Sequence, residues 1–379
     1  RRDKQGFLPE LMEKMYGDRV VYKKKAIEAK IEYQKTNDPI YSNEISRCHN
    51  IQMAKKISLN SAYGAIGNQY FRYFDVKQAE AITLGGQLSI RWVERDVNRF
   101  MNKLLGTDNK NYVVASDTDS IYLKLDTLVE KVCKGKSTKQ IVEFLNKAAE
   151  EKIQKVIDDS FENLAKYVNA YDQKMIMKRE AIANKGIWVA KKRYMMNVFD
   201  EEGIRFDIPK LKIMGVEAVK SSTPEVCRGK IKDAIRVIMN DSEDALIKFV
   251  TDFKEVFKTL SPEEVAFPRS CNNIDKYVDS NSIYKKGTPI HVKGALIYNH
   301  HILKNKLQRK YPLIKDGDKI KFLMLRQPNT VKDTVISFAT KIPYEFDLHK
   351  YVDYETQVTK TFTDPVSYTH LRAHETSRD

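Results

Sequence analysis

The sequence predicts an α+β fold with more than one domain. Three observations support this: stretches with helical periodicity fill the first third, short β-branched and aromatic runs follow, and helical patterns return after residue 221. At 379 residues, the chain is long enough for two or three domains. Hydrophobic residues make up 42% and charged residues 31%, a composition that excludes an intrinsically disordered protein.

The first third predicts a pair of helices followed by a third one. Apolar positions recur at helical spacing over residues 8–35 and again over about 41–66, and the intervening residues 37–39, Asn-Asp-Pro, are turn formers. A long amphipathic stretch over 77–105 stops before Gly106, and glycine is the residue that most often ends a helix.

The middle of the chain predicts alternating strands and helices. Tyr112–Ala115 and Ile121–Leu123 have the composition of two strands that meet at a tight turn, and residues 137–168 return to helical periodicity. Further strands are expected at Met175–Met177, Ile187–Ala190 and Tyr194–Val198. These short strands predict an antiparallel sheet with helices behind it.

A boundary is expected at residues 221–224, Ser-Ser-Thr-Pro, because proline favours the first position of a helix. A mostly helical segment then runs to about Leu260. From there to about Pro365 the pattern is mixed and irregular, and Val366–Asp379 has no periodicity. We expect no structure in that last segment.

The charge balance predicts a polyanionic partner. Lys plus Arg exceed Asp plus Glu by 15, which favours nucleic acid first and an anionic membrane surface second. The four cysteines are scattered without a CxxC pair, which argues against a zinc ribbon or disulfide framework and favours a reducing compartment. No apolar run approaches the roughly 18 to 20 residues of a membrane span, and Arg1 starts no secretory leader. Because residue 1 is not Met, we expect it to be an interior point of a longer reading frame.

Two acids lie at the expected strand–strand turn. In a hairpin, residues two apart point to the same side, so Asp117 and Asp119 are expected to converge at an exposed tip, where carboxylate oxygens suit Mg²⁺. The alternative is that Asp and Thr are simply good turn formers, and for these residues alone that interpretation is the simpler one.

A stripe of functional groups lies on the second predicted helix. At about 100° per residue, Lys56, Asn60, Tyr63 and Gly64 share one face, which would offer a nucleotide a cation, an amide, a ring and an open position. The partner helix carries a second cationic pair one turn apart, Arg19 and Lys23. The alternative for both helices is an ordinary solvated face.

Two basic segments are candidates for contact with a phosphodiester backbone. Lys191, Lys192, Arg193 and Tyr194 place three consecutive cations at a strand end, beside an aromatic residue that would pack behind them. Residues 210–215 alternate cations, including Lys212, with apolar side chains that would point inward. A basic turn without a ligand is the alternative.

Taken in order, five segments resemble family B DNA polymerases, in particular the replicative enzymes of T-even-type tailed bacteriophages. They are KKISLNSAYGAIGNQYFRYFD, SDTDSIY, GIWVAKKRY, PKLKIMGVE and KSSTP. The resemblance covers residues 8–365 and implies the C-terminal portion of such an enzyme. It implies a helical fingers hairpin at 1–66, an antiparallel-sheet palm with backing helices at 67–217, a mostly helical thumb at 218–365, and an appended tail at 366–379.

The resemblance also implies roles for individual residues. Lys56 and Asn60 match the residues that hold the phosphates of the incoming nucleotide, and Tyr63 matches an aromatic residue of the nascent base-pair pocket. Arg19 and Lys23 are similar to the cationic pair of the opposite fingers helix. Asp117 and Asp119 match the metal-binding carboxylates of the catalytic centre, with Asp119 as the direct ligand. The residues that resemble the primer-contacting segment are Lys191, Lys192, Arg193 and Tyr194.

The implied reaction is template-directed DNA synthesis, in which two Mg²⁺ ions assist nucleotidyl transfer from a dNTP to a primer 3′-hydroxyl. The family takes a third carboxylate from an upstream D-x-x-S-L-Y-P-S motif, which this sequence lacks, as it lacks the exonuclease domain. We therefore expect a fragment or half of a split enzyme, inactive by itself. Ser116 also replaces the usual glycine before the first acid.

The implied partners are primer–template DNA, dNTP and, for a split enzyme, an N-terminal polymerase portion in the cytoplasm of a phage-infected host. No membrane partner is implied. Because Val366–Asp379 resembles a translated adaptor, we expect the family's C-terminal peptide that docks on a sliding clamp to be missing. Two alternatives remain: a non-catalytic DNA-binding module whose acids only shape a turn, and a Mg²⁺-dependent nuclease, which would give no reason for the nucleotide stripe.

Overall fold

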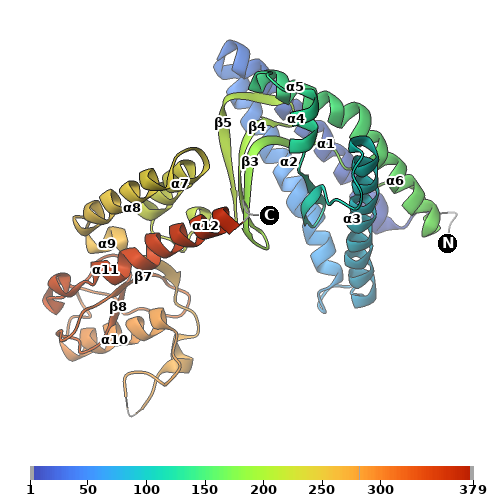
Figure 1. Ribbon diagram of the computed structural model, residues 1–379. Helices are drawn as coiled ribbons and strands as arrows, with labels where there is room; N and C mark the ends of the chain where they lie inside the picture. Colours follow the sequence, from blue (N-terminus) through green and yellow to red (C-terminus); the bar gives the residue numbers. More distant parts are fainter. Residues whose placement is uncertain (1–3, 281, 376–379) are drawn as a thin grey trace. The chain divides into compact units, whose positions relative to one another are not determined.

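The chain folds into two compact units, and the α+β class predicted from the sequence is confirmed. The computed structural model describes residues 4–280 and 282–375. Unit 1 comprises the described residues up to Ala183 together with Val198–Pro209, and unit 2 comprises Asn184–Asn197 together with the described residues from Lys210 onward. Figure 1 labels the helices and strands of both.

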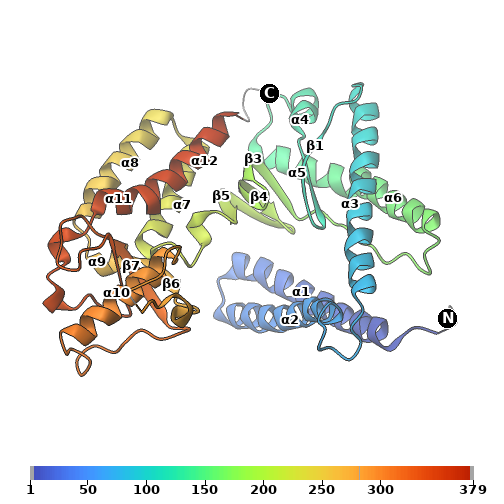
Figure 2. The ribbon, with the colours of Figure 1, turned by 90° about the horizontal axis from the view of Figure 1, so that it is seen from below.

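Unit 1 begins with a hairpin of two long helices, α1 (Phe7–Thr36) and α2 (Pro39–Ile66), which run side by side (Figure 2). The turn forms because Asn37 takes the left-handed conformation, with φ of 53°, and ends α1. Asp38 then caps α2 by accepting a hydrogen bond from the Ile40 amide at 2.9 Å. The predicted helix pair and its turn are confirmed.

Helix α3 (Val76–Leu105) forms the core of unit 1 with α6 (Gln154–Tyr167). Gly106 ends α3 with φ of 65°, as the sequence predicts. The buried stripe of α3 includes Val93, Val97 and Met101, and it packs on buried side chains of α6. Because apolar residues recur once per turn on both helices, each buries one face.

The strands β1 (Val113–Asp117) and β2 (Ser120–Leu123) form an antiparallel hairpin against α3. Asn98 of α3 fixes its first strand, since its side-chain oxygen accepts hydrogen bonds from the amides of Tyr112 and Val113 at 2.8 and 3.1 Å. The helices that follow are α4 (Asp126–Val132), α5 (Thr138–Ala148), a π-helical turn (Ala149–Ile153) and α6. Of these, only α4 was not predicted.

A three-stranded sheet of order β3-β4-β5 contributes residues to both units. Its strands are β3 (Ala181–Ala190), β4 (Arg193–Glu201) and β5 (Ile204–Met214). The strand predicted at Met175–Met177 is wrong, because this segment has no regular structure. The side chain of Gln173 accepts a hydrogen bond from the Met175 amide at 2.6 Å and donates one to the Met175 carbonyl at 2.9 Å. These backbone groups therefore do not pair with a neighbouring strand.

Unit 2 combines helices with a second sheet. Helix α7 (Glu225–Asn240) starts directly after Pro224, as predicted, and α8 (Glu243–Lys258) and the short α9 (Pro262–Val265) follow. The region described from sequence as mixed and irregular contains an antiparallel sheet of order β6-β7-β8, with α10 (Ile290–Lys304) packed on β8. These strands are Phe267–Ser270, Lys319–Met324 and Val335–Phe338.

The expectation that Val366 onward has no structure is wrong as far as residue 375. After α11 (Tyr354–Val358) and a π-helical turn (Thr359–Thr363), helix α12 spans Asp364–Glu375 and packs against α7. Val366 is buried in the core of unit 2, and this burial stabilises α12 as part of the folded unit. Residues 376–379 of the predicted tail lie outside the described residues.

Within the described ranges, all helices are too short or too polar to cross a lipid bilayer. The four cysteines are free thiols, and each is buried. Burial raises the pKa of the Cys227 thiol to about 11.

Candidate active site

The two predicted metal-binding acids lie at the tip of the β1–β2 hairpin. Asp117 pairs with Ser120, so the connection contains only Thr118 and Asp119. The Asp119 amide donates to the Asp117 carbonyl at 2.7 Å, and Thr118 has φ of 59°. A β-branched residue rarely adopts this left-handed conformation, and such strained turns cluster at functional sites.

Residues two apart in a strand point to the same side, but only Asp117 of these two acids lies in a strand. Asp117 ends β1 and is half-buried, whereas Asp119 lies in the turn and is exposed. Both carboxylates accept hydrogen bonds from neighbouring hydroxyls: Thr118 donates to Asp117 at 3.0 Å and Ser120 to Asp119 at 3.4 Å. The position of Asp119 is therefore set by the turn and not by the strand.

The donor chemistry of the hairpin tip fits a hard divalent cation, because carboxylate oxygens are the ligands that Mg²⁺ prefers in proteins. The acids provide two carboxylates on neighbouring positions of a constrained turn. Within residues 4–280 and 282–375, no three His, Cys, Asp or Glu side chains come together in a way that would hold a metal ion.

The predicted stripe on α2 is accessible along its length. Lys56 and Asn60 are exposed, and Tyr63 is 43% exposed. At Gly64, a methyl group in place of the hydrogen would meet no atom within 4 Å. Because α2 is helical throughout Pro39–Ile66, the spacing of these residues places them on one open face.

An ion pair joins α1 and α2 one residue before Lys56. Lys55 of α2 forms an ion pair with Asp18 of α1 at 2.7 Å, and this contact lowers the pKa of the Asp18 carboxyl. Arg19 and Lys56 are the sequence neighbours of that pair. Arg19 is half-buried, and its Nε finds no hydrogen-bond partner among the described residues.

Lys23, one turn after Arg19, has a partner that the sequence did not suggest. Its ammonium forms an ion pair with Glu202, which lies in the turn between β4 and β5. Both side chains are partly exposed. The Lys23 ammonium is therefore already paired with a carboxylate of the same unit.

The basic turn at residues 191–192 connects β3 and β4. Lys191 and Lys192 are exposed, and Lys192 has φ of 60°. Gly215 packs directly on this turn, since a Cβ at that position would lie 2.1 Å from the Lys192 carbonyl oxygen. Tyr194 is buried and stacks on Trp188, with ring centroids 6.2 Å apart, as predicted for an aromatic backing. Lys212, on β5, is half-buried.

Arg193, which follows the two exposed lysines, is half-buried. Its guanidinium forms an ion pair with Glu217 and lies over the ring of Tyr368 at 5.5 Å. Burial opposes ionisation of Glu217, but a hydrogen bond from Lys220 and the charge of Arg193 leave the pKa of this carboxyl below its ordinary value. Arg193 therefore has structural partners within unit 2.

The predicted site residues fall into two groups. Those on α1, on α2 and at the β1–β2 tip belong to unit 1, where α2 packs on α3 and α3 packs on the hairpin. The residues of the basic turn and Lys212 belong to unit 2. Sequence reasoning missed Glu202 and Gly215. An acidic turn of sequence Asp-Glu-Glu-Gly at 200–203 was the one available signal for Glu202.

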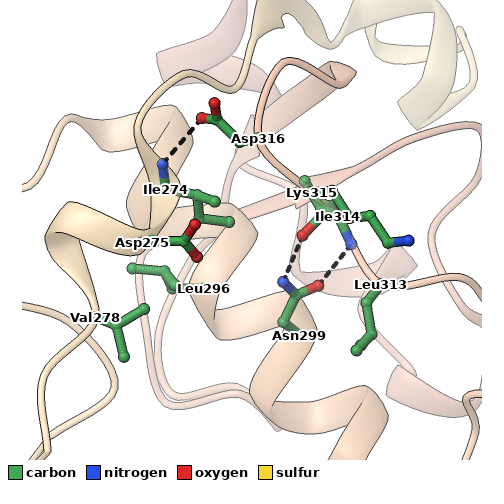
Figure 3. A pocket seen from close by; sticks show the side chains of 9 residues that line it. All are labelled: Ile274, Asp275, Val278, Leu296, Asn299, Leu313, Ile314, Lys315 and Asp316. Carbon is green, nitrogen blue, oxygen red and sulfur yellow. Dashed lines mark hydrogen bonds between the residues drawn. The ribbon is translucent and has the colours of Figure 1, made fainter.

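Two of the cavities among the described residues lie in unit 2, and none of the predicted site residues lines either of these two. The larger, of about 460 Å³, is shown in Figure 3. There Asn299 of α10 exchanges two hydrogen bonds of 2.8 Å with the backbone of Ile314. Asn299 thus holds the loop before β7, which is a structural role.

The sequence matches the family model of DNA polymerase family B over residues 1–369. The DNA-directed DNA polymerase of Escherichia phage RB69 is 38% identical over 329 residues, which cover 83% of this chain and 36% of that relative. The enzyme of the same name from Enterobacteria phage T4 is 36% identical over 330 residues, covering 83% and 36%. DNA polymerase 1 of Pyrococcus abyssi is 25% identical over 357 residues, covering 93% and 38%. The chain spans about a third of the length of these curated relatives.

Proposed function

The chain belongs to DNA polymerase family B, and from this premise we propose that it provides the nucleotide-binding and part of the metal-binding machinery of a template-directed DNA polymerase. The observation that carries the proposal is the open stripe of Lys56, Asn60, Tyr63 and Gly64 on α2. Its substrates would be a dNTP and a primer–template, used in replication within a host cell.

In this proposal the helix hairpin binds the triphosphate. Lys56 and Arg19 would offer charge-assisted hydrogen bonds to phosphate oxygens, and Asn60 would add an amide donor. Tyr63 would pack against the sugar or base, with Gly64 leaving space for close approach.

Asp117 and Asp119 would hold divalent metal, with Asp119 as the direct ligand. When bound, a pair of Mg²⁺ ions supplies activation of the primer 3′-hydroxyl and neutralisation of the leaving pyrophosphate. The constrained turn supports this role, because it fixes the two carboxylates before any ligand arrives. Residues beyond these two acids would complete the coordination.

The basic turn would contact the primer backbone. Lys191 and Lys192 are exposed cations on a turn that Gly215 braces, and Tyr194 supports it from inside. Lys212 would add a further phosphate contact from β5. Arg193 would act mainly by holding this turn through Glu217.

We assign residues 1–66 to the fingers, 67–217 to the palm and 218–365 to the thumb. The end of α2 at Ile66 and the start of α7 after Pro224 support these limits. The compact units follow a different division, since Asn184–Asn197 and Lys210–Glu217 belong to unit 2. The part of the palm around the basic turn is therefore packed with the thumb segment.

The test is the affinity of the chain for a deoxynucleoside triphosphate with Mg²⁺, measured by titration calorimetry. Lys56→Ala is expected to weaken binding roughly tenfold or more, because a charge-assisted hydrogen bond to phosphate is lost. Lys24→Ala is the matched control. It removes the same charge from α1 at an exposed position, where Lys24 forms a long ion pair of 3.9 Å with Glu28.

Lys24→Ala should leave the affinity unchanged within about twofold. Equal affinities for the wild type and Lys56→Ala would contradict the nucleotide site. DNA binding without any nucleotide binding would instead favour a non-catalytic DNA-binding module.

A further inference from the structure

The turn between β4 and β5 is built around a buried carboxylate. Asp200 is fully buried and forms ion pairs with Arg179 and Arg205. It also accepts a hydrogen bond from the amide of Gly203 at 3.0 Å. Because a buried charge is stable only when it is paired and hydrogen-bonded, this arrangement fixes the path of the turn.

Glu202 occupies the tip of this fixed turn. Its amide donates to the Glu180 carbonyl at 2.7 Å, and its backbone has φ of 54°. The side chain reaches Lys23 in the middle of α1, a residue 179 positions earlier in the sequence. The exposed fractions are 41% for the Lys23 side chain and 28% for that of Glu202, so the pair is open to solvent and to ions.

From this geometry we propose that Glu202 is an intramolecular competitor for Lys23, which occupies the ammonium until the phosphates of a nucleotide replace it. Glu202 would then be a positioning residue that sets nucleotide affinity through Lys23. The inference rests on the proposed function, because it takes Lys23 to be one of the phosphate-binding cations.

The physical reason is competition between two anions for one cation. A carboxylate bound to Lys23 uses one of the three ammonium hydrogens and cancels its charge locally. A polyphosphate that approaches Lys23 must also approach Glu202, and like charges at close range repel. A nucleotide must therefore displace Glu202 from Lys23, or it binds with an affinity that this repulsion lowers.

A second ion pair of α1 provides a matched control. Glu13 accepts a hydrogen bond from Lys174 at 2.8 Å, and Lys174 lies in the segment after α6. This pair also ties α1 to the rest of unit 1, but it involves none of the cations assigned to the nucleotide. Glu201→Gln is a second control, because it removes the same charge one position away from Glu202.

The experiment measures the affinity of the full chain for Mg²⁺–dATP in the wild type, Glu202→Gln, Glu13→Gln and Glu201→Gln, each also with Lys23→Ala. Glu202→Gln is expected to raise the affinity roughly two- to fivefold at low salt, the range expected for one exposed ion pair. The gain should disappear in the Lys23→Ala background, because the effect acts through that ammonium. The other two single variants should stay close to the wild type.

Equal affinities of Glu202→Gln and Glu201→Gln would overturn the competition while leaving the proposed function intact. A gain that persists without Lys23 would overturn it as well, since it would then be a general charge effect. Wild-type chain that binds no Mg²⁺–dATP would overturn both the proposed function and this inference. A lower affinity in Glu202→Gln would show that the carboxylate assists binding, which contradicts competition.

Discussion

At the scale of single residues, the basic turn can keep its backbone conformation only because residue 215, which packs on it, is a glycine. Gly215 has φ of 66°, and an added Cβ would lie 2.1 Å from the Lys192 carbonyl oxygen and 3.2 Å from Cγ of Arg193. The first neighbour is backbone, so it cannot rotate away. The orientation of Lys191 and Lys192 therefore depends on a glycine more than twenty positions later in the chain.

We predict that Gly215→Ala lowers the free energy of unfolding of unit 2 by about 2 to 4 kcal/mol, because it combines a left-handed backbone with a backbone clash. The measurement is urea unfolding followed by fluorescence, with Trp188 reporting on this sheet. Gly229→Ala is the control: it lies within α7, and a Cβ there meets nothing within 4 Å. That variant should be more stable by about 0.5 to 1 kcal/mol. Equal stability of Gly215→Ala and the wild type would refute the bracing role.

At the scale of elements, the β3–β4 connection contains two exposed cations, and the cation that follows them is paired within unit 2. Lys191 and Lys192 are exposed at the turn, whereas Arg193 is paired with Glu217 and covered by Tyr368. Three adjacent cations in the sequence therefore do not amount to three contacts with DNA. Only the first two are expected to release counterions from the phosphate backbone on binding.

We predict that the double variant Lys191→Ala, Lys192→Ala weakens primer–template binding for all sequences alike. The slope of log affinity against log salt should flatten by about two units, at roughly 0.9 per lost phosphate contact on duplex DNA. Arg193→Ala should change the slope little and mainly reduce the stability of unit 2. The measurement is fluorescence anisotropy with duplexes of two unrelated sequences between low and moderate salt. Loss confined to one sequence would argue against a backbone contact.

The helices and the acidic hairpin could be predicted because their signals are local. The α1–α2 turn follows from Asn37 and Asp38, and the end of α3 follows from Gly106. Strands without alternation were harder to predict. All four residues of β8, Val335–Phe338, are buried, so this strand has no polar face to mark its period. The false strand at Met175–Met177 shows the opposite error, since an apolar run there has no pairing partner.

The residues of the candidate site could be predicted from the sequence, but the ion-pair partners of these residues could not. Lys56 and Asn60 lie on the exposed face that the helical period predicts. The pairing of Lys23 with Glu202 and of Arg193 with Glu217 joins residues far apart in the sequence, and no local pattern encodes such contacts. The helical structure of α12 up to residue 375 was missed for the same reason, because it depends on contacts of Val366 with side chains far away in the sequence.

At the scale of the whole molecule, the two units divide the proposed work. Unit 1 contains the cation-bearing helix hairpin and the two acids, and unit 2 contains the basic turn with the segment that we propose as the thumb. The net charge of +15 suits a protein that binds polyanions along much of its surface. The central claim is narrower: the acids of the β1–β2 tip act as metal ligands in the same site that binds the nucleotide through α2.

The most direct test is primer extension by a chimaera in which this chain replaces the matching third of the phage RB69 polymerase. Asp119→Asn keeps the size of the side chain and removes a metal ligand, so we predict a loss of extension rate on the order of a thousandfold or more, with DNA binding retained. Asp126→Asn, which neutralises an exposed acid at the start of α4, should extend primers at the rate of the unsubstituted chimaera. Extension by Asp119→Asn at that same rate would contradict the account.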